Sequence, residues 1–224
     1  PQGWNWRVSN IENIVFETYK NLTLESLKEN PDVIVWPEYA LPDDLEKNNE
    51  LLSKVINLSK KTNAYLVLGV LKQHEKSYNE RKNYFEDIAL VFRNGTFLGE
   101  YSSVSPAIYE KWVVPGEEIK TFEFKNKTFG ITICYEETQR EVNKEYSDSE
   151  VNFIISLANN QIFKDSKEGL HLASLNSRLN AAENKIYVLR TTNTGITQIV
   201  NPYGKIVGKL EPNTRGILIG EIYI

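Results

Sequence analysis

Methionine is absent from this chain of 224 residues, and cysteine occurs only once, as Cys134. A single cysteine cannot form an internal disulfide, so cysteine usage leaves the redox compartment open. Apolar runs long enough to cross a bilayer are also absent. The net charge of −4 provides no basic surface of the kind that binds nucleic acid. Nothing in the sequence indicates a metal ion or a cofactor.

What is present is the composition of a globular domain. Hydrophobic residues make up 41% and charged residues 25%, and the length suffices for one domain with a full core. Because we see no internal repeat, linker or low-complexity tract, residues 1–224 are predicted to form a single domain. The chain begins at Pro1 with no methionine and no strand before its first helical pattern. We therefore expect an excised domain, or one that lacks its first strand.

Helical and strand-like patterns alternate along the chain. The predicted helices cover residues 10–30, residues 45–62 and a segment with one face marked by Leu172, Leu175, Leu179 and Ala182. The predicted strands cover residues 32–36, 64–70, 84–92, 96–101, 121–124, the run before Cys134, 151–157, 186–190, 196–200 and 217–222. Asn94-Gly95 is a hairpin signal, and residues 102–119 have no period, which predicts a long loop. The alternation favours an α/β fold with mixed sheets.

The cysteine stands where a predicted strand ends, just before Glu136 and Glu137. A lone cysteine is more often a packed core residue than a reactive one. A strand end, however, is a place where a rigid scaffold can present a side chain to a cleft. The functional interpretation therefore depends on which other residues accompany Cys134.

Two further residues complete a possible catalytic set. Glu38 follows the predicted buried strand 32–36, and Lys111 lies in the predicted long loop. A cysteine nucleophile needs a base to take its proton and a cation or N–H group to hold developing oxyanion charge. A glutamate can be that base and a lysine that cation. Taken singly, Glu38 could equally be a capping or solvated acid, and a loop lysine is usually solvated.

The order Glu, Lys, Cys resembles the nitrilase (carbon–nitrogen hydrolase) superfamily. The likeness rests on Trp36-Pro37-Glu38, on Ile133-Cys134-Tyr135-Glu136 and on the stretch Arg190 to Thr197. Within that superfamily the sequence is most similar to the catalytic domain of apolipoprotein N-acyltransferase. Shorter matches continue the resemblance over nearly the whole chain, at residues 31–38, 156–160, 178–183, 201–204 and 214–216.

The resemblance implies a four-layer αββα sandwich with mixed β-sheets and a covalent thioester mechanism. In that mechanism Glu38 would be the general base, Lys111 the oxyanion stabiliser and Cys134 the nucleophile. The backbone N–H of Tyr135 would be a second oxyanion donor. A supporting glutamate of the family would fall on Glu117, or on Glu118 with a different gap.

One alignment choice stays open in the predicted long loop. Tyr101-Ser102-Ser103 lies nearer to the hairpin than Tyr109-Glu110-Lys111 does. If the first tripeptide is the family's Tyr-x-Lys, then Ser103 replaces the lysine and the protein would be a non-catalytic relative. We favour Lys111 because Pro115, Gly116 and Glu117 then come into line, although its spacing to Cys134 is short.

Three functions follow from these alternatives. The first is acyl transfer from a phospholipid to the amino terminus of a lipoprotein, at the outer face of the cytoplasmic membrane. The second is hydrolysis of small carboxamides by a soluble, cytoplasmic amidase. The third is a non-catalytic binding or scaffolding role. The superfamily resemblance also implies that a homodimer is possible, and neither the resemblance nor the composition indicates nucleic acid as a partner.

Overall fold

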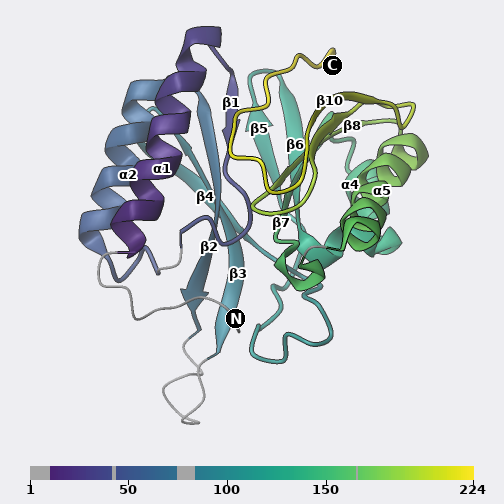
Figure 1. Ribbon diagram of the computed structural model, residues 1–224, viewed down its shortest axis with the longest axis horizontal. Coiled ribbons are helices and arrows are strands. Elements are labelled where there is room, and N and C mark those ends of the chain that lie inside the picture. Colours follow the sequence, from purple (N-terminus) through teal and green to yellow (C-terminus); the bar gives the residue numbers. More distant parts are fainter. Residues whose placement is uncertain (1–10, 42–43, 75–83, 165) are drawn as a thin grey trace.

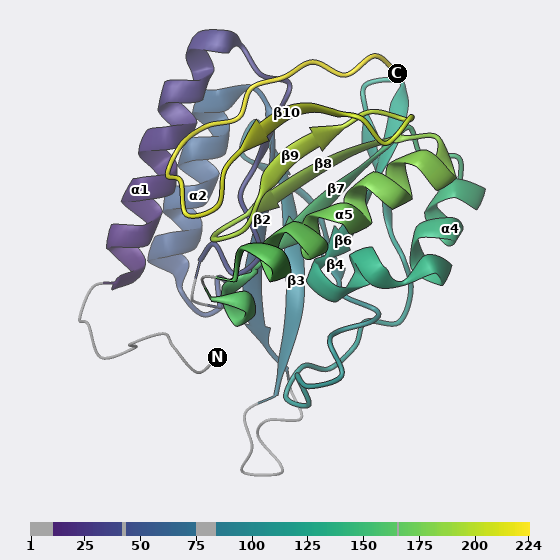
Figure 2. The ribbon, with the colours of Figure 1, turned by 45° about the vertical axis from the view of Figure 1, so that its right-hand side comes forward.

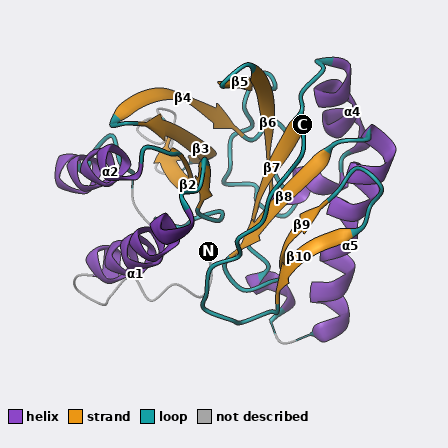
Figure 3. Cartoon of the chain, turned by 90° about the horizontal axis from the view of Figure 1, so that it is seen from above, coloured by secondary structure: helices purple, strands orange, loops and turns teal. Residues whose placement is uncertain are grey.

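Two mixed β-sheets pack face to face, and each carries two helices on its outer side (Figure 1). This computed structural model describes residues 11–41, 44–74, 84–164 and 166–224. Seen from above, the layers follow one another as helices, sheet, sheet and helices (Figure 3). The α/β class, the mixed sheets and the αββα layering predicted from the sequence are confirmed. The expectation about a missing first strand concerns residues outside the described ranges.

The first sheet has four strands in the order β1-β2-β3-β4. Its strands are β1 (Val33–Val35), β2 (Tyr65–Gln73), β3 (Phe85–Arg93) and β4 (Thr96–Ser102). β1 runs parallel to β2, and the other neighbours are antiparallel. The predicted hairpin between β3 and β4 is present, since Asn94 and Gly95 both have positive φ, as a two-residue turn of this kind requires.

The second sheet has six strands in the order β10-β9-β8-β7-β6-β5. Its strands are β5 (Thr121–Phe124), β6 (Lys127–Ile133), β7 (Phe153–Ala158), β8 (Tyr187–Thr192), β9 (Thr197–Val200) and β10 (Ile206–Leu210). β6, β7 and β8 are parallel, whereas the outer pairs are antiparallel. Because the central three strands are parallel, their carboxyl ends meet at one edge, which is where β6 delivers Cys134.

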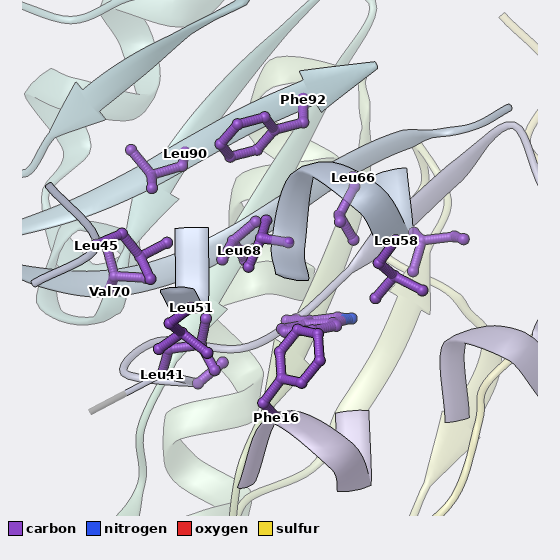
Figure 4. Close-up of a cluster of buried hydrophobic side chains, with 14 of the residues drawn as sticks. Phe16, Leu41, Leu45, Leu51, Leu58, Leu66, Leu68, Val70, Leu90 and Phe92 are labelled. Carbon is purple, nitrogen blue, oxygen red and sulfur yellow. The ribbon is translucent and has the colours of Figure 1, made fainter. Parts of the chain in front are cut away.

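The outer face of the first sheet is covered by α1 (Ile11–Ser26) and α2 (Asn49–Thr62). The 3₁₀ turn η1 (Leu27–Glu29) follows α1, and Asn30 closes it in the left-handed conformation just before Pro31. The helices pack apolar side chains against the sheet. The cluster includes Phe16, Leu51, Leu58, Leu66, Leu68, Val70, Leu90 and Phe92 (Figure 4).

The outer face of the second sheet is covered by α4 (Arg140–Asp148) and α5 (Lys167–Asn184) (Figure 2). The helical prediction for α5 is confirmed, but its predicted apolar face is not the buried one, since Leu172 and Leu179 are exposed. α5 instead presents Ser174 and Ser177 to the sheet. Buried Gln198 of β9 donates hydrogen bonds to the Ser174 carbonyl and the Ser177 hydroxyl, both at 2.7 Å.

The space between the two sheets is filled mainly by aromatic and β-branched side chains. Phe129 of β6 stacks on Phe122 and Phe153 at ring-centroid distances of 5.4 and 5.3 Å. Tyr65 of the opposite sheet meets Phe129 edge-on. Burying these faces against each other fixes the ends of β1 and β6 relative to one another, and those ends carry Glu38 and Cys134.

Two further sequence predictions need correction. The pattern at residues 217–222 predicts a last strand, but these residues form none, although Ile222 packs against the core between the sheets. The strand at this edge is β10, which pairs with β9 after the turn at Asn201 and Gly204. The sequence patterns also missed α4 and the 3₁₀ turn η3 (Gln161–Phe163). The predicted loop 102–119 contains only one isolated bridge, between Phe85 and Val113.

Candidate active site

Glu38 lies in a turn held from both sides just after β1. The Trp36 N–H continues the β1 ladder by donating to the Val67 carbonyl at 2.8 Å. Its indole, which is buried, donates to the Thr23 hydroxyl at 2.9 Å. The Glu38 carbonyl in turn accepts a hydrogen bond from the Asn193 amide at 3.2 Å. The side chain of Glu38 is thereby aimed into the protein and is only 1% exposed.

Gly69 of β2 lets this turn lie directly on the sheet. A β-carbon added at position 69 would come within 2.6 Å of the Pro37 carbonyl oxygen and 2.7 Å of the Glu38 Cα. Both are backbone atoms, which cannot move aside as a flexible side chain would. The close approach of Glu38 to the sheet therefore requires glycine at this position.

We expect Gly69→Ala to lower the free energy of unfolding by about 1–3 kcal/mol, as overpacking of a filled interior does. Thermal unfolding followed by circular dichroism measures the change. Gly216→Ala is the matched control, because a β-carbon there would meet only Leu210 methyl carbons at 3.8 and 3.9 Å. Equal unfolding temperatures for the two variants would contradict this account of the Glu38 turn.

Cys134 follows β6 directly and opens the 3₁₀ turn η2 (Cys134–Thr138). Its φ is 51°, in the left-handed region that non-glycine residues enter at a cost of about 1–3 kcal/mol. The residue is partly exposed, and its Sγ lies 4.0 Å from the Asn159 carbonyl oxygen at the end of β7. The thiol thus lies at the carboxyl ends of the parallel strands β6 and β7. The surrounding residues hold its backbone in the left-handed conformation.

Glu136, two residues after the cysteine, ties the η2 turn to the loop after β4. Its carboxylate is fully buried and accepts five hydrogen bonds. Four go to Oε1 and one to Oε2, and the donors are the Tyr101 hydroxyl (2.7 Å), the Ser103 hydroxyl (3.0 Å), and the N–H groups of Val104 (2.7 Å), Ser105 (3.2 Å) and Ile133 (2.7 Å). The turn and the loop are therefore joined by one side chain.

Glu137 anchors the same turn to the second sheet through a buried ion pair. The Arg190 Nε lies 3.0 Å from both of its carboxylate oxygens, and both side chains are almost completely buried. The Arg190 guanidinium also donates to the Ile196 carbonyl and to the Asn160 side chain. The charge of Glu137 is thus fully paired, and this residue belongs to the framework of the site.

Three carboxyl groups gather around the thiol. Glu38 lies near Cys134, and Asp87 of β3 lies near Glu38. The third carboxyl group belongs to Glu110, whose negative charge acts on Glu38, on Asp87 and on the thiol. The pKa of Glu38 is raised from 4.5 to about 8, first because burial disfavours its charged form and second because Glu110 is negative. Burial and Glu38 likewise raise the pKa of Asp87 and of the Cys134 thiol.

These groups are incompletely hydrogen-bonded. Both carboxylate oxygens of Glu38, Oδ1 of Asp87 and the hydroxyl of Tyr39 are buried and have no partner of normal geometry in the described part of the chain. Tyr39 lies among the same groups. Its pKa is raised by burial first, and then by the charges of Asp87, Glu38, Glu110 and Cys134. The site is therefore acidic, mostly buried and short of hydrogen-bond donors.

The structure brings Glu38 and Cys134 together but does not bring Lys111 to them. Lys111 is exposed and forms no ion pair within the described residues. Glu117 and Glu118, the alternative supporting acids, are exposed as well. Ser103 is buried and bonded to Glu136. Tyr135 lies beside Cys134 in η2, as its sequence position requires.

Glu110 is the site residue that sequence reasoning missed. It is half-buried and belongs to a loop pinned to the start of β3, where the Phe85 N–H donates to the Trp112 carbonyl at 3.0 Å. Within that loop Val113 N–H donates to the Glu110 carbonyl at 2.8 Å, and the negative charge of the Glu110 carboxylate helps to raise the pKa of the thiol. The local sequence carries no periodicity that would have distinguished Glu110 from its neighbours.

The described residues contain no group of three or more histidine, cysteine, aspartate or glutamate side chains arranged to hold a metal ion. They also contain no helix that is both long enough and apolar enough to cross a membrane.

Comparison with known proteins gives a consistent family and fold. Residues 8–224 match the sequence profile described as Carbon-nitrogen hydrolase. The apolipoprotein N-acyltransferase of Haemophilus ducreyi is 29% identical, over 99% of this chain and 47% of its own length. That of Borreliella burgdorferi is 25% identical, over 90% of this chain and 43% of its own length. The chain thus spans less than half the length of these two curated relatives.

Solved structures share the fold at low sequence identity. A carbon–nitrogen hydrolase from Helicobacter pylori superposes with a TM-score of 0.78 at 16% identity, covering 92% of this chain and 82% of that one. A mutant of the amidase from Nesterenkonia sp. AN1 superposes with a TM-score of 0.77 at 13% identity, covering 95% and 88%. That amidase structure is described as showing acrylamide added to the active-site cysteine.

Proposed function

Because this chain belongs to the carbon–nitrogen hydrolase family, we propose that it catalyses acyl transfer through a thioester on Cys134, with Glu38 as the general base. The observation that carries the proposal is that the buried Glu38 carboxyl group lies near enough to the thiol of the only cysteine for each to shift the pKa of the other, with the pKa of Glu38 raised to about 8. A base with a pKa of about 8 is close to the range in which proton transfer works well at neutral pH.

The chemistry proceeds in two steps. Ionised Glu38 takes the thiol proton, and Sγ attacks the acyl carbonyl carbon to form a tetrahedral oxyanion. Collapse of that oxyanion expels the leaving group, which receives the proton from Glu38, and leaves the acyl group on sulfur. An acceptor then attacks the thioester carbonyl carbon and loses its proton to Glu38. Collapse of this second oxyanion breaks the C–S bond, and Sγ regains the proton from Glu38, which restores the thiol and the base. The acceptor decides whether the outcome is transfer or hydrolysis.

The family relatives favour an amine acceptor. The curated relatives in the comparison are named apolipoprotein N-acyltransferases. We therefore extend the proposal to a phospholipid acyl donor, the amino terminus of a lipoprotein as acceptor, and action at a membrane surface. The likeness to amidases is a likeness of fold, and hydrolysis of a small carboxamide is the outcome of the same acyl-enzyme when water is the acceptor.

A second candidate is a non-catalytic relative, and one observation favours it. Lys111 is exposed, Ser103 is buried at the edge of the site, and no ion pair of the described residues places a lysine or arginine on Glu38, Asp87 or Glu110. A thiolate and an oxyanion formed without a cation would rest on N–H donors alone. This candidate predicts a thiol that stays unmodified by every acyl donor.

Intact-mass spectrometry separates these candidates, because a single cysteine makes any thioester a single mass increment on the chain. The protein is offered phospholipid vesicles in one arm and a small carboxamide in the other. An acyl increment in either arm supports the thioester proposal, and an increment that is lost to a diacylglyceryl-cysteine peptide supports transfer. No increment from either donor, with the thiol still open to iodoacetamide, would favour the non-catalytic relative.

We expect Lys111→Ala to leave the rate of acyl-enzyme formation within about twofold of the wild-type rate, because an exposed side chain that forms no ion pair with the described residues contributes little. Intact-mass time courses give the two rates under identical donor concentrations. A loss of about tenfold or more would mean that the lysine enters the site when substrate binds, and would restore it to the catalytic set.

A further inference from the structure

Three segments at the carboxyl ends of β6, β7 and β8 contribute to the site. Cys134 opens the η2 turn after β6. Asn159, after β7, places its carbonyl oxygen 4.0 Å from the Cys134 Sγ. The loop between β8 and β9 carries Asn193, whose amide donates to the Glu38 carbonyl at 3.2 Å. The position of Cys134 relative to Glu38 therefore depends on how these segments are joined to one another.

The side chain of Arg190, near the end of β8, forms hydrogen bonds to all three segments. Its Nε lies 3.0 Å from both carboxylate oxygens of Glu137 in η2. Its Nη2 donates to Asn160 Oδ1 at 2.9 Å, one residue beyond Asn159. Its Nη1 donates to the Ile196 carbonyl in the β8–β9 loop. One guanidinium group thus joins the nucleophile turn to the loop that holds the Glu38 backbone.

These contacts are buried and closely packed. Arg190 is 2% exposed, and Glu137 is 4% exposed. The Glu137 carbonyl also accepts a hydrogen bond from the Asn180 amide of α5 at 2.8 Å. A β-carbon added at Gly195 would come within 2.1 Å of Asn160 Oδ1, so the β8–β9 loop lies directly on that side chain. A buried planar group whose donors are fixed in three directions leaves these segments little room to shift.

We propose that Arg190 is a positioning residue, which sets the place of Cys134 relative to Glu38 by joining η2 to the β8–β9 loop. The inference rests on the proposed function, in which these two residues are nucleophile and base. Arg190 acts on Cys134 through Glu137, and on Glu38 through the loop that carries Asn193. Reacting groups misplaced by about 1 Å can lose about 10²-fold in rate.

Arg190→Lys separates position from charge. Lysine keeps the positive charge, but its compact ammonium group cannot reach the three segments at once as the planar fork does. We expect acylation at saturating donor to slow by about tenfold or more. The donor concentration that gives half of the maximal rate should stay within about twofold, because the substitution removes no contact with the donor. Intact-mass time courses give both quantities, and an unchanged saturating rate would overturn the proposal.

The pH dependence of Cys134 alkylation reports the same geometry without an acyl donor. Burial first, and then the charge of Glu38, raise the pKa of the thiol. Glu38, whose pKa is about 8, is already ionised when the thiol loses its proton at higher pH. If Arg190→Lys lets Cys134 move away from Glu38, the pH midpoint of alkylation by iodoacetamide should fall by about one unit. A merely structural role would lower the unfolding temperature and leave this midpoint unchanged.

Val55→Ala is the control for lost stability. Val55 of α2 is completely buried in the cluster on the outer side of the first sheet, away from the three segments. Shortening it lowers the unfolding temperature, as removal of buried methyl groups does. We expect the alkylation midpoint and the saturating acylation rate to match those of the wild type. A shifted midpoint in this control would mean that lost stability alone moves the thiol, and would overturn the assignment.

Gly195→Ala tests the same connection at a second place, and it decides the question if Arg190→Lys does not fold. The added β-carbon forces Asn160 away from its present position and so disturbs its bond to Arg190 Nη2. We expect a downward shift of the alkylation midpoint. Gly216→Ala is the matched control, because its β-carbon would meet only Leu210 methyl carbons at 3.8 and 3.9 Å. Equal midpoints for the two glycine variants would overturn the proposal.

This proposal and the thioester proposal fail in different ways. A wild-type thioester, together with an unchanged midpoint and saturating rate in Arg190→Lys, overturns the positioning role and leaves the thioester proposal standing. A wild-type protein that forms no thioester overturns the thioester proposal. A lowered alkylation midpoint in Arg190→Lys would then still support the part of Arg190 in placing Cys134 beside Glu38.

Discussion

Cys134→Ala is expected to abolish acyl-enzyme formation completely while the protein stays folded. The substitution removes only the sulfur, which lies 4.0 Å from the Asn159 carbonyl and holds no part of the framework. The η2 turn remains fixed by Glu136 and by the Glu137–Arg190 ion pair. Alanine at φ 51° carries the same kind of backbone cost as cysteine, so little additional strain arises.

Intact-mass spectrometry after incubation with the acyl donor measures the loss, and circular dichroism checks the fold. Wild-type protein alkylated beforehand with iodoacetamide is the matched control, because it blocks the same sulfur without a mutation. A mass increment that persists on the alanine variant would place the acyl group on another nucleophile and end the assignment of Cys134.

Glu38→Gln is expected to slow acylation by about 10²- to 10⁴-fold, which is the usual contribution of a positioned general base. Glutamine keeps the shape of the side chain but cannot take the thiol proton. Because the pKa of Glu38 is about 8, the wild-type rate should rise with pH through that value, and the variant should lose this inflection. Stopped time courses of the thioester mass between about pH 6 and about pH 9 give both profiles.

The same variant should be more resistant to unfolding at alkaline pH. The folded state holds the Glu38 proton up to about pH 8, whereas the unfolded chain releases it near the ordinary pKa of 4.5. The stability that the proton contributes is therefore full below that ordinary pKa and is lost as pH rises through about 8. Glutamine removes this dependence. If wild type and variant lose stability in parallel over this range, Glu38 is not the buried acid described above.

The sheets were predictable because their causes are local and repetitive. β2, β3, β6 and β7 are apolar runs, and Asn94-Gly95 fixes the β3–β4 turn. The face of α5 was predicted incorrectly, because its buried side is defined by hydrogen bonds from Gln198 to Ser174 and Ser177. No hydrophobic pattern reveals such bonds. β10 was missed because Gly208 and Lys209 interrupt its apolar residues.

The candidate site was likewise predictable where its residues follow strands, and unpredictable where they lie in the loop. Glu38 and Cys134 follow buried strands, so the packing of the two sheets brings them together and the sequence indicates both. Glu110 and Lys111 are neighbours in a loop, and hydrogen bonds between this loop and Phe85, which is distant in the sequence, leave Glu110 half-buried and Lys111 exposed. An irregular segment has no period from which direction can be read.

The five bonds to Glu136 have a consequence for how the site can move. Since one carboxylate holds both the residues after β4 and the η2 turn, neither segment can open without breaking bonds that hold the other. We therefore expect the two to open only together, as a single cooperative unit. Amide hydrogen exchange should then be slow in both segments and faster in the outer part of the loop, where Ile108 and Tyr109 are exposed.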